Sequence, residues 1–233
     1  MKKEIILFDL DGTLTDPVEG ITKSVQYALG HYGICEEDLL KLTPFIGPPL
    51  RDSFMKYYGF SREQADEAVW VYREYFAEKG IFENREIPGI RKMLETLAAA
   101  GRKLYVATSK PEIYARQILA HFQMDSYFLF IGGADMGETR VRKGDVIRYV
   151  LEEAGFLKGD PKEASSWNGI SPESVVMAGD REHDILGAKE NGIHSVGFLM
   201  GYGSREELLK AGADRIAEDA EEMTRILLEN WGD

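Results

Sequence analysis

The chain has 233 residues, of which 44% are hydrophobic, and a formal net charge of −12. This length allows one well-packed core with a smaller inserted domain, and the acidic balance argues against nucleic-acid or anionic-membrane partners, because those surfaces attract basic proteins. Cys35 is the only cysteine, and the start MKKEIILFDLDG has too few apolar residues for a signal peptide or a membrane span. We therefore expect a cytoplasmic protein with no membrane partner.

The first predicted element is a buried strand at residues 4–10, a short apolar run that ends in a turn at Gly12. From about residue 18 to 82, hydrophobic residues recur at spacings of three and four, which predicts about four helices separated by glycines and prolines. After Gly89, helices alternate with apolar strands. The expected helices span residues 90–100, 112–121, 143–154 and 184–191, and the expected strands span 103–109, 127–133, 174–180 and 194–199.

Apolar strands that alternate with amphipathic helices predict an α/β fold, with a parallel sheet covered on both faces. Residues 1–16 and 88–233 are expected to form this core, and residues 17–87 an all-helical insertion. The polar stretch at residues 157–171 is expected to be an exposed loop.

Carboxylates, hydroxyl groups and lysines stand where the predicted strands end. Ligands of an open parallel sheet bind outside the carboxyl ends of its strands, so these side chains are expected to meet at one edge. They are Asp9 and Asp11 after the first strand, Thr108, Ser109 and Lys110 after the second, Asp180 and Asp184 after the fourth, and Lys143 at the start of the helix after the third.

This set suits phosphoryl transfer through a covalent aspartyl phosphate. The carboxylate of Asp9 is ionised at neutral pH and can attack phosphorus without a base. Crowding it with Asp180 and Asp184 requires a cation, and hard oxygen ligands without His or Cys suit Mg²⁺. Asp11 is expected to protonate the leaving oxygen and then to activate water. The expected Mg²⁺ ligands are Asp9, Asp11, Asp180 and Asp184.

Groups that bind phosphate are expected around these carboxylates. Gly12 permits a sharp turn that brings backbone amides close to phosphate oxygens. Thr108 would donate a hydrogen bond, and the helix that begins near Pro111 would point its free amides at the same place. Of the basic cluster of Arg140, Arg142 and Lys143, we expect Lys143 to supply the positive charge that binds the phosphate, because this residue directly begins the helix. Ser109 and Lys110 are further candidates for substrate binding.

Four stretches, DLDGTLTD, VATSKP, Lys143 before a helix, and MAGDREHDILGAKENG, together resemble the four motifs of the haloacid dehalogenase-like hydrolase superfamily. The likeness covers essentially the whole chain and is greatest to phosphoglycolate-phosphatase-like members. The resemblance implies a Rossmann-like sheet core with the insertion as a helical cap. It also implies an Mg²⁺-dependent phosphatase in which Asp9 is the nucleophile, Asp11 the acid and base, Thr108 and Lys143 bind phosphate, and Asp180 and Asp184 hold the metal.

The insertion contains a rigid turn, FIGPPLRDSF, at residues 45–54. In capped members of the superfamily such a turn tends to lie over the active site and to contact the leaving group of the substrate. The resemblance therefore implies that Gly47, Pro48 and Arg51 help to bind substrate.

The predicted function is hydrolysis of small soluble phosphomonoesters, with phosphoglycolate favoured and nucleoside monophosphates, the substrates of a 5'-nucleotidase, as the alternative. A phosphosugar mutase similar to β-phosphoglucomutase is a second alternative. The resemblance to that group implies a cap turn with an arginine where this chain has Leu50, although a shift of one residue would bring Arg51 into that place. A dehalogenase is disfavoured because such relatives lack the second aspartate, here Asp11. A module that only binds phosphate would not need both Asp9 and Asp11.

Overall fold

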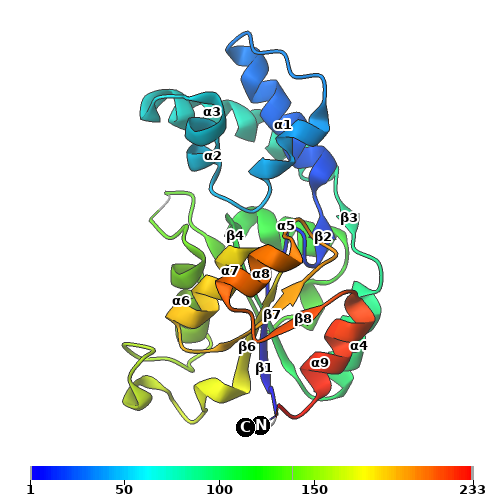
Figure 1. The fold of residues 1–233 in the computed structure, drawn as a ribbon, viewed down its shortest axis with the longest axis vertical. Coiled ribbons are helices and arrows are strands. Elements are labelled where there is room, and N and C mark those ends of the chain that lie inside the picture. Colours follow the sequence, from blue (N-terminus) through cyan, green and yellow to red (C-terminus); the bar gives the residue numbers. More distant parts are fainter. Residues whose placement is uncertain (1, 138, 232–233) are drawn as a thin grey trace. The chain divides into compact units, whose positions relative to one another are not determined.

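The computed structural model describes residues 2–137 and 139–231. The chain divides into two compact units, Met1–Leu14 with Glu86–Asp233, called the core, and Thr15–Arg85, called the cap. The expected borders were residues 16 and 88, and near these positions two short strands, β2 (Thr15–Asp16) and β3 (Arg85–Glu86), pair with each other. The other regular elements of the insertion are helices, joined by loops and turns (Figure 1).

The core contains a six-stranded sheet in the order β5-β4-β1-β6-β7-β8, and every pairing in it is parallel. The central strand has the sequence IILF, and all four residues are buried because helices cover both faces. The strands are β1 (Ile5–Phe8), β4 (Lys103–Pro111), β5 (Phe130–Ala134), β6 (Val175–Gly179), β7 (His194–Phe198) and β8 (Arg215–Ala217).

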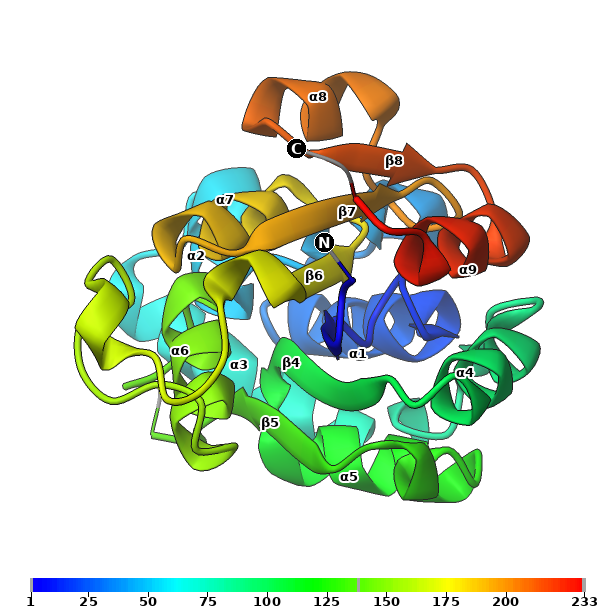
Figure 2. The ribbon, with the colours of Figure 1, turned by 90° about the horizontal axis from the view of Figure 1, so that it is seen from below.

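Helices pack on both sides of the sheet. Seen from below, α6 and α7 lie on one side, and α4 and α9 lie on the other (Figure 2). The helices of the core are α4 (Ile90–Ala99), α5 (Glu112–His121), α6 (Lys143–Glu153), α7 (Glu182–Glu190), α8 (Arg205–Ala211) and α9 (Ala220–Leu228), with short 3₁₀ turns at Asp125–Tyr127, Ala164–Ser166 and Pro172–Ser174. The predicted α/β fold with a parallel sheet and an inserted helical domain is confirmed.

The cap consists of helices joined by tight turns. Ser61 and Gln64 form a capping box at the start of α3, and Gly59 ends α2 with a positive φ of 67°. The elements are α1 (Val18–His31), a 3₁₀ helix (Leu39–Phe45), α2 (Leu50–Tyr58), α3 (Arg62–Tyr75) and a π-helical turn (Phe76–Gly80). Gly20 of α1 packs directly against this last turn, since a Cβ there would lie 1.9 Å from the carbonyl oxygen of Gly80.

Two parts of the core differ from the sequence-based expectations. The stretch at residues 157–171 is not simply an exposed loop: Trp167 is only 9% exposed, joins the hydrophobic cluster beside α6, and donates its indole N–H to the carbonyl of Pro161. The chain after residue 199, for which no element was predicted, forms α8, β8 and α9. Within the described residues, no helix has both the length and the apolar character needed to cross a bilayer.

Candidate active site

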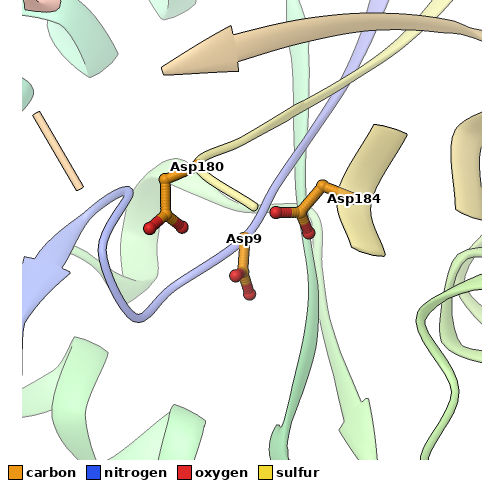
Figure 3. A group of neighbouring side chains, drawn as sticks. All are labelled: Asp9, Asp180 and Asp184. Atoms are coloured by element: carbon orange, nitrogen blue, oxygen red, sulfur yellow. The ribbon is translucent and has the colours of Figure 1, made fainter. Parts of the chain in front are cut away.

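Three buried carboxylates converge at the carboxyl edge of the sheet: Asp9, Asp180 and Asp184 (Figure 3). One carboxylate oxygen of each lies within 4.8 Å of one oxygen of each of the other two. Asp9 follows β1 and Asp180 follows β6, and the parallel pairing of these strands aligns Phe8 with Ala178, so the two residues leave the sheet side by side. Asp184 comes from the first turn of α7.

Glycines make room for these carboxylates. A Cβ at Gly12, whose φ is +84°, would lie 2.3 Å from Asp180 Oδ2, and a Cβ at Gly179 would lie 2.2 Å from Asp184 Cγ. No side chain fits at such distances, so glycine is required on both steric and, at Gly12, conformational grounds. The structural reason for Gly12 is thus the close approach of Asp180.

Lys143 lies buried between two of the carboxylates. Its Nζ is 2.8 Å from Asp9 Oδ1 and 2.9 Å from Asp184 Oδ1, and it donates a hydrogen bond to the carbonyl of Ala107 at 3.0 Å. Burial disfavours the ammonium, but the two carboxylates outweigh it and raise the pKa of Lys143. Its neighbour Arg142 is 68% exposed in its side chain and pairs with Glu190, so the structure places Lys143, and not Arg142, with the carboxylates.

The negative charge of the site exceeds what its lysine neutralises. Burial, reinforced by the charges of Asp184 and Asp9, raises the pKa of Asp180 well above its ordinary value, and burial raises the pKa of Asp184 to about 6 against the opposing effect of Lys143. Asp9 Oδ1 and Asp184 Oδ1 are buried, and both form ion pairs with the Lys143 ammonium. Hard oxygen donors crowded in this way fit a divalent cation such as Mg²⁺.

The side chain of Asp11 points to a different partner. Its Oδ2 accepts a hydrogen bond from Lys110 Nζ at 2.6 Å, and both side chains are buried. The group of converging carboxylates found among the described residues does not include Asp11, which was expected to bind the metal with its neighbours. Burial raises the pKa of Asp11, although Lys110 lowers it. A carboxyl group with a raised pKa can hold a proton and release it, as the expected acid and base must.

Thr108 is buried in β4, just before the irregularity of this strand, and its Oγ1 accepts a hydrogen bond from the Lys110 amide at 3.2 Å. Ser109 is half-buried beside it. The strand continues through an irregularity to Pro111, and α5 begins only at Glu112, so Pro111 precedes the helix instead of forming its first residue. The second motif therefore brings Thr108 and Lys110 to the same edge as the carboxylates, as expected.

Two contacts of the site were missed at the sequence level. Asp180, which is 0% exposed, accepts hydrogen bonds from Thr13 Oγ1 at 3.3 Å and from the Tyr202 amide at 2.7 Å. The second donor comes from the loop after β7, where Gly201 and Gly203 also pack against Asp180. The two glycines that flank Tyr202, a few residues after β7, are a sequence signal that could have identified this loop.

The remaining candidates, Gly47, Pro48 and Arg51, belong to the cap. Gly47 has a φ of +101° and starts the turn that leads into α2. The guanidinium of Arg51 forms an ion pair with Asp66 of α3, which ties the start of α2 to the neighbouring helix. This pairing gives Arg51 a role within the cap that the sequence did not suggest.

Comparison with known proteins identifies the family. The profile of haloacid dehalogenase-like hydrolases matches residues 6–198. A 5'-nucleotidase of Pseudomonas aeruginosa is 48% identical over 203 residues, 87% of this chain and 86% of that protein, and phosphoglycolate phosphatase 1 of the same organism is 25% identical over 205 residues, 85% of this chain and 70% of that protein. The crystal structure of a predicted phosphatase from Clostridium acetobutylicum matches with a TM-score of 0.89 and 43% identity, covering 98% of this chain and 99% of that one. These matches support the expected phosphatase class, and the chain belongs to the haloacid dehalogenase-like hydrolase family.

Proposed function

We propose that this enzyme is an Mg²⁺-dependent phosphatase that hydrolyses small phosphomonoesters through a phosphorylated Asp9. The observation that carries the proposal is the convergence of Asp9, Asp180 and Asp184 on one buried edge of the sheet, with Lys143 between Asp9 and Asp184. A buried cluster of this charge is costly without a cation, which gives the site a reason to bind a metal and a doubly charged phosphate together.

The metal would be held by Asp9, Asp180 and Asp184, which each offer a buried carboxylate oxygen within 4.8 Å of the other two. When bound, Mg²⁺ would neutralise negative charge on the carboxylates and on the phosphate. Lys143 adds a fixed positive charge at Asp9, which orients this nucleophile.

Asp9 attacks phosphorus, and the bond between phosphorus and the leaving oxygen breaks as the new acyl phosphate forms. Asp11, whose pKa is raised by burial, delivers its proton to the leaving oxygen and later takes a proton from the water that cleaves the acyl phosphate. Lys110 fixes the Asp11 carboxylate through its hydrogen bond. Thr108, Ser109 and the turn at Gly12 line the same strand ends and are assigned to the phosphate oxygens.

For the substrate, we favour nucleoside 5'-monophosphates over phosphoglycolate. The support is the higher identity of the relative named 5'-nucleotidase, which covers most of both chains, compared with the relative named phosphoglycolate phosphatase. Gly47, Pro48 and Arg51 in the cap are assigned to substrate selection. The proposal places the enzyme in the cytoplasm, where a reducing environment suits the exposed thiol of Cys35.

The test is phosphate release from nucleoside monophosphates, phosphoglycolate, hexose phosphates, pyrophosphate and a generic aryl phosphate, each with Mg²⁺ and with EDTA. Mg²⁺-dependent release that is fastest from a nucleoside monophosphate is the expected result. Faster release from phosphoglycolate would contradict the proposed nucleotide substrate but would still support the phosphatase reaction. Absence of release from every compound, together with isomerisation of a hexose phosphate, would replace the phosphatase with a phosphosugar mutase.

A further inference from the structure

A short segment after β7 supports the metal-binding carboxylates. This segment, residues 201–207, comprises the loop Gly201–Gly203 and the first residues of α8. It contacts Asp180 directly and the turn between β6 and α7 through Glu207. None of its side chains is part of the converging carboxylate group, so its effect on that group is indirect.

The loop fixes Asp180 from two sides. The amide of Tyr202 donates a 2.7 Å hydrogen bond to Asp180 Oδ2, and the chain approaches so closely that a Cβ at Gly203 would lie 1.9 Å from the Asp180 carbonyl oxygen. A Cβ at Gly201 would lie 2.3 Å from Asp180 Oδ2. Both the carboxylate and the backbone of Asp180 are therefore held against this loop.

Glu207 holds the residues that follow Asp180. Its Oε1 accepts two hydrogen bonds, from Arg181 Nε at 2.8 Å and from the Glu182 amide at 2.9 Å. The backbone amide of Arg181 in turn donates to Asp184 Oδ2 at 3.1 Å. A single carboxylate oxygen on α8 thus fixes the turn whose two ends carry Asp180 and Asp184.

The position of Glu207 is itself well determined. Ser204 caps α8 by accepting a hydrogen bond from the Glu207 amide at 3.1 Å. The next residue, Leu208, is fully buried and packs against Ile185 of α7. A side chain anchored in this way can orient the groups that it binds, because little conformational entropy remains to be lost there.

We propose that Glu207 is a positioning residue for the metal site, which holds the turn between Asp180 and Asp184 and thereby sets the affinity of the enzyme for Mg²⁺. The inference rests on the proposed function, since it assumes that these carboxylates bind the metal. Groups that orient metal ligands typically change metal affinity by 10- to 100-fold when they are removed. Glu207 is the side chain through which this fold exerts that control on Asp180 and Asp184 together.

The experiment is isothermal titration of MgCl₂ into the purified wild-type enzyme and four variants. E207A removes both hydrogen bonds, and E207D keeps the charge but shortens the side chain, so we expect both to weaken Mg²⁺ binding by about 10-fold. E207Q keeps the accepting oxygen at the same length and should lose less affinity. E206A, which alters the exposed neighbouring residue on the same helix turn, is the matched control and should bind Mg²⁺ as the wild type does.

A second measurement separates positioning from general stability. In steady-state assays the Mg²⁺ concentration for half-maximal activity should rise in E207A and E207D, while kcat at saturating Mg²⁺ changes little. Wild-type Mg²⁺ affinity in both variants, even with a lowered melting temperature, would overturn the role of Glu207 alone. A wild-type enzyme that binds no Mg²⁺ would overturn the metal site and this inference together. Should E207A not fold, E207D decides.

Discussion

The Lys143 ammonium lies 2.8 Å from Asp9 Oδ1, in the buried interior of the core. It arrives there because α6 begins at Lys143 and packs against β4, whose Ala107 carbonyl accepts a hydrogen bond from the same ammonium. The lysine is therefore fixed by the scaffold and not by the substrate. A charge that is preorganised in this way stabilises negative charge without the cost of reorganising solvent during the reaction.

Replacing Lys143 should damage both stability and activity. In K143M, three buried carboxylates lose their nearby cation, so we expect the free energy of unfolding without Mg²⁺ to fall by about 3 kcal/mol. We expect kcat to fall at least about 100-fold, the usual effect of removing a preorganised charge. The control is R142M, whose exposed pair with Glu190 should contribute less than about 1 kcal/mol. Equal effects of the two substitutions would contradict the assignment of Lys143.

Asp9 should be indispensable for turnover but not for folding. D9N retains the shape of the side chain and removes the nucleophile, so kcat should fall at least about 1,000-fold. Folding should persist, because the Asp9 charge raises the pKa values of Asp180 and Asp184 and its loss relieves that repulsion. Acid quenching of a reaction with substrate that carries radioactive phosphorus in its phosphoryl group should leave label on the wild-type protein and none on D9N. Activity near that of the wild type would remove Asp9 from the nucleophile role.

The carboxylate cluster could be predicted from sequence because its members follow strands of a parallel sheet. Buried strands give a clear apolar signal, and the parallel topology brings their carboxyl ends to one edge, which is why Asp9 and Asp180 were placed together. The choice of Lys143 over Arg142 followed from its position at the start of a helix. The direction of the Asp11 side chain could not be predicted, because its partner Lys110 is far away in sequence. The pattern of hydrophobic residues also carries no information about side-chain rotamers.

Contacts made by loops could not be predicted from the sequence patterns. The amide of Tyr202 carries no side-chain signal, although it makes the 2.7 Å bond to Asp180. Trp167 lies in a stretch rich in Gly, Ser and charged residues, a composition typical of exposed loops. The stretch is partly buried because the Trp167 side chain packs into the hydrophobic core. The ion pair between Arg51 and Asp66 joins two helices whose relative placement no local pattern specifies.

Arg51 can be tested for a substrate role that is separate from its ion pair. Both R51A and D66A break that pair, so each should lower the stability of the cap by up to about 1 kcal/mol. If Arg51 also binds substrate, R51A should reduce kcat/KM for nucleoside monophosphates at least about 10-fold, the effect of losing a charged hydrogen bond, whereas D66A should leave it unchanged. Matching kcat/KM values in the two variants would confine Arg51 to the cap's own structure.

Lys3, at the opposite end of β1 from Asp9, should make stability depend on pH in the alkaline range. It is only 1% exposed, donates to the Glu173 carbonyl at 2.6 Å and lies 4.5 Å from the centre of the Trp231 ring. Burial lowers the pKa of Lys3 below its ordinary 10.5 despite the nearby carboxylates. Between the folded and unfolded pKa values the unfolded chain binds more protons, so stability rises with pH through that window.

Because the buried ammonium is disfavoured below this window, K3M should be as stable as the wild type or more stable by about 1 kcal/mol at pH 7. The advantage should shrink as the pH approaches 10.5, where neutral Lys3 no longer carries the cost of a buried charge. Denaturant unfolding at a series of pH values measures this difference, and K2M at the exposed neighbouring residue is the matched control. A K3M variant that is less stable at pH 7, with a deficit that does not depend on pH, would show that the contacts of Lys3 with Glu173 and Trp231 outweigh the cost of burying its charge.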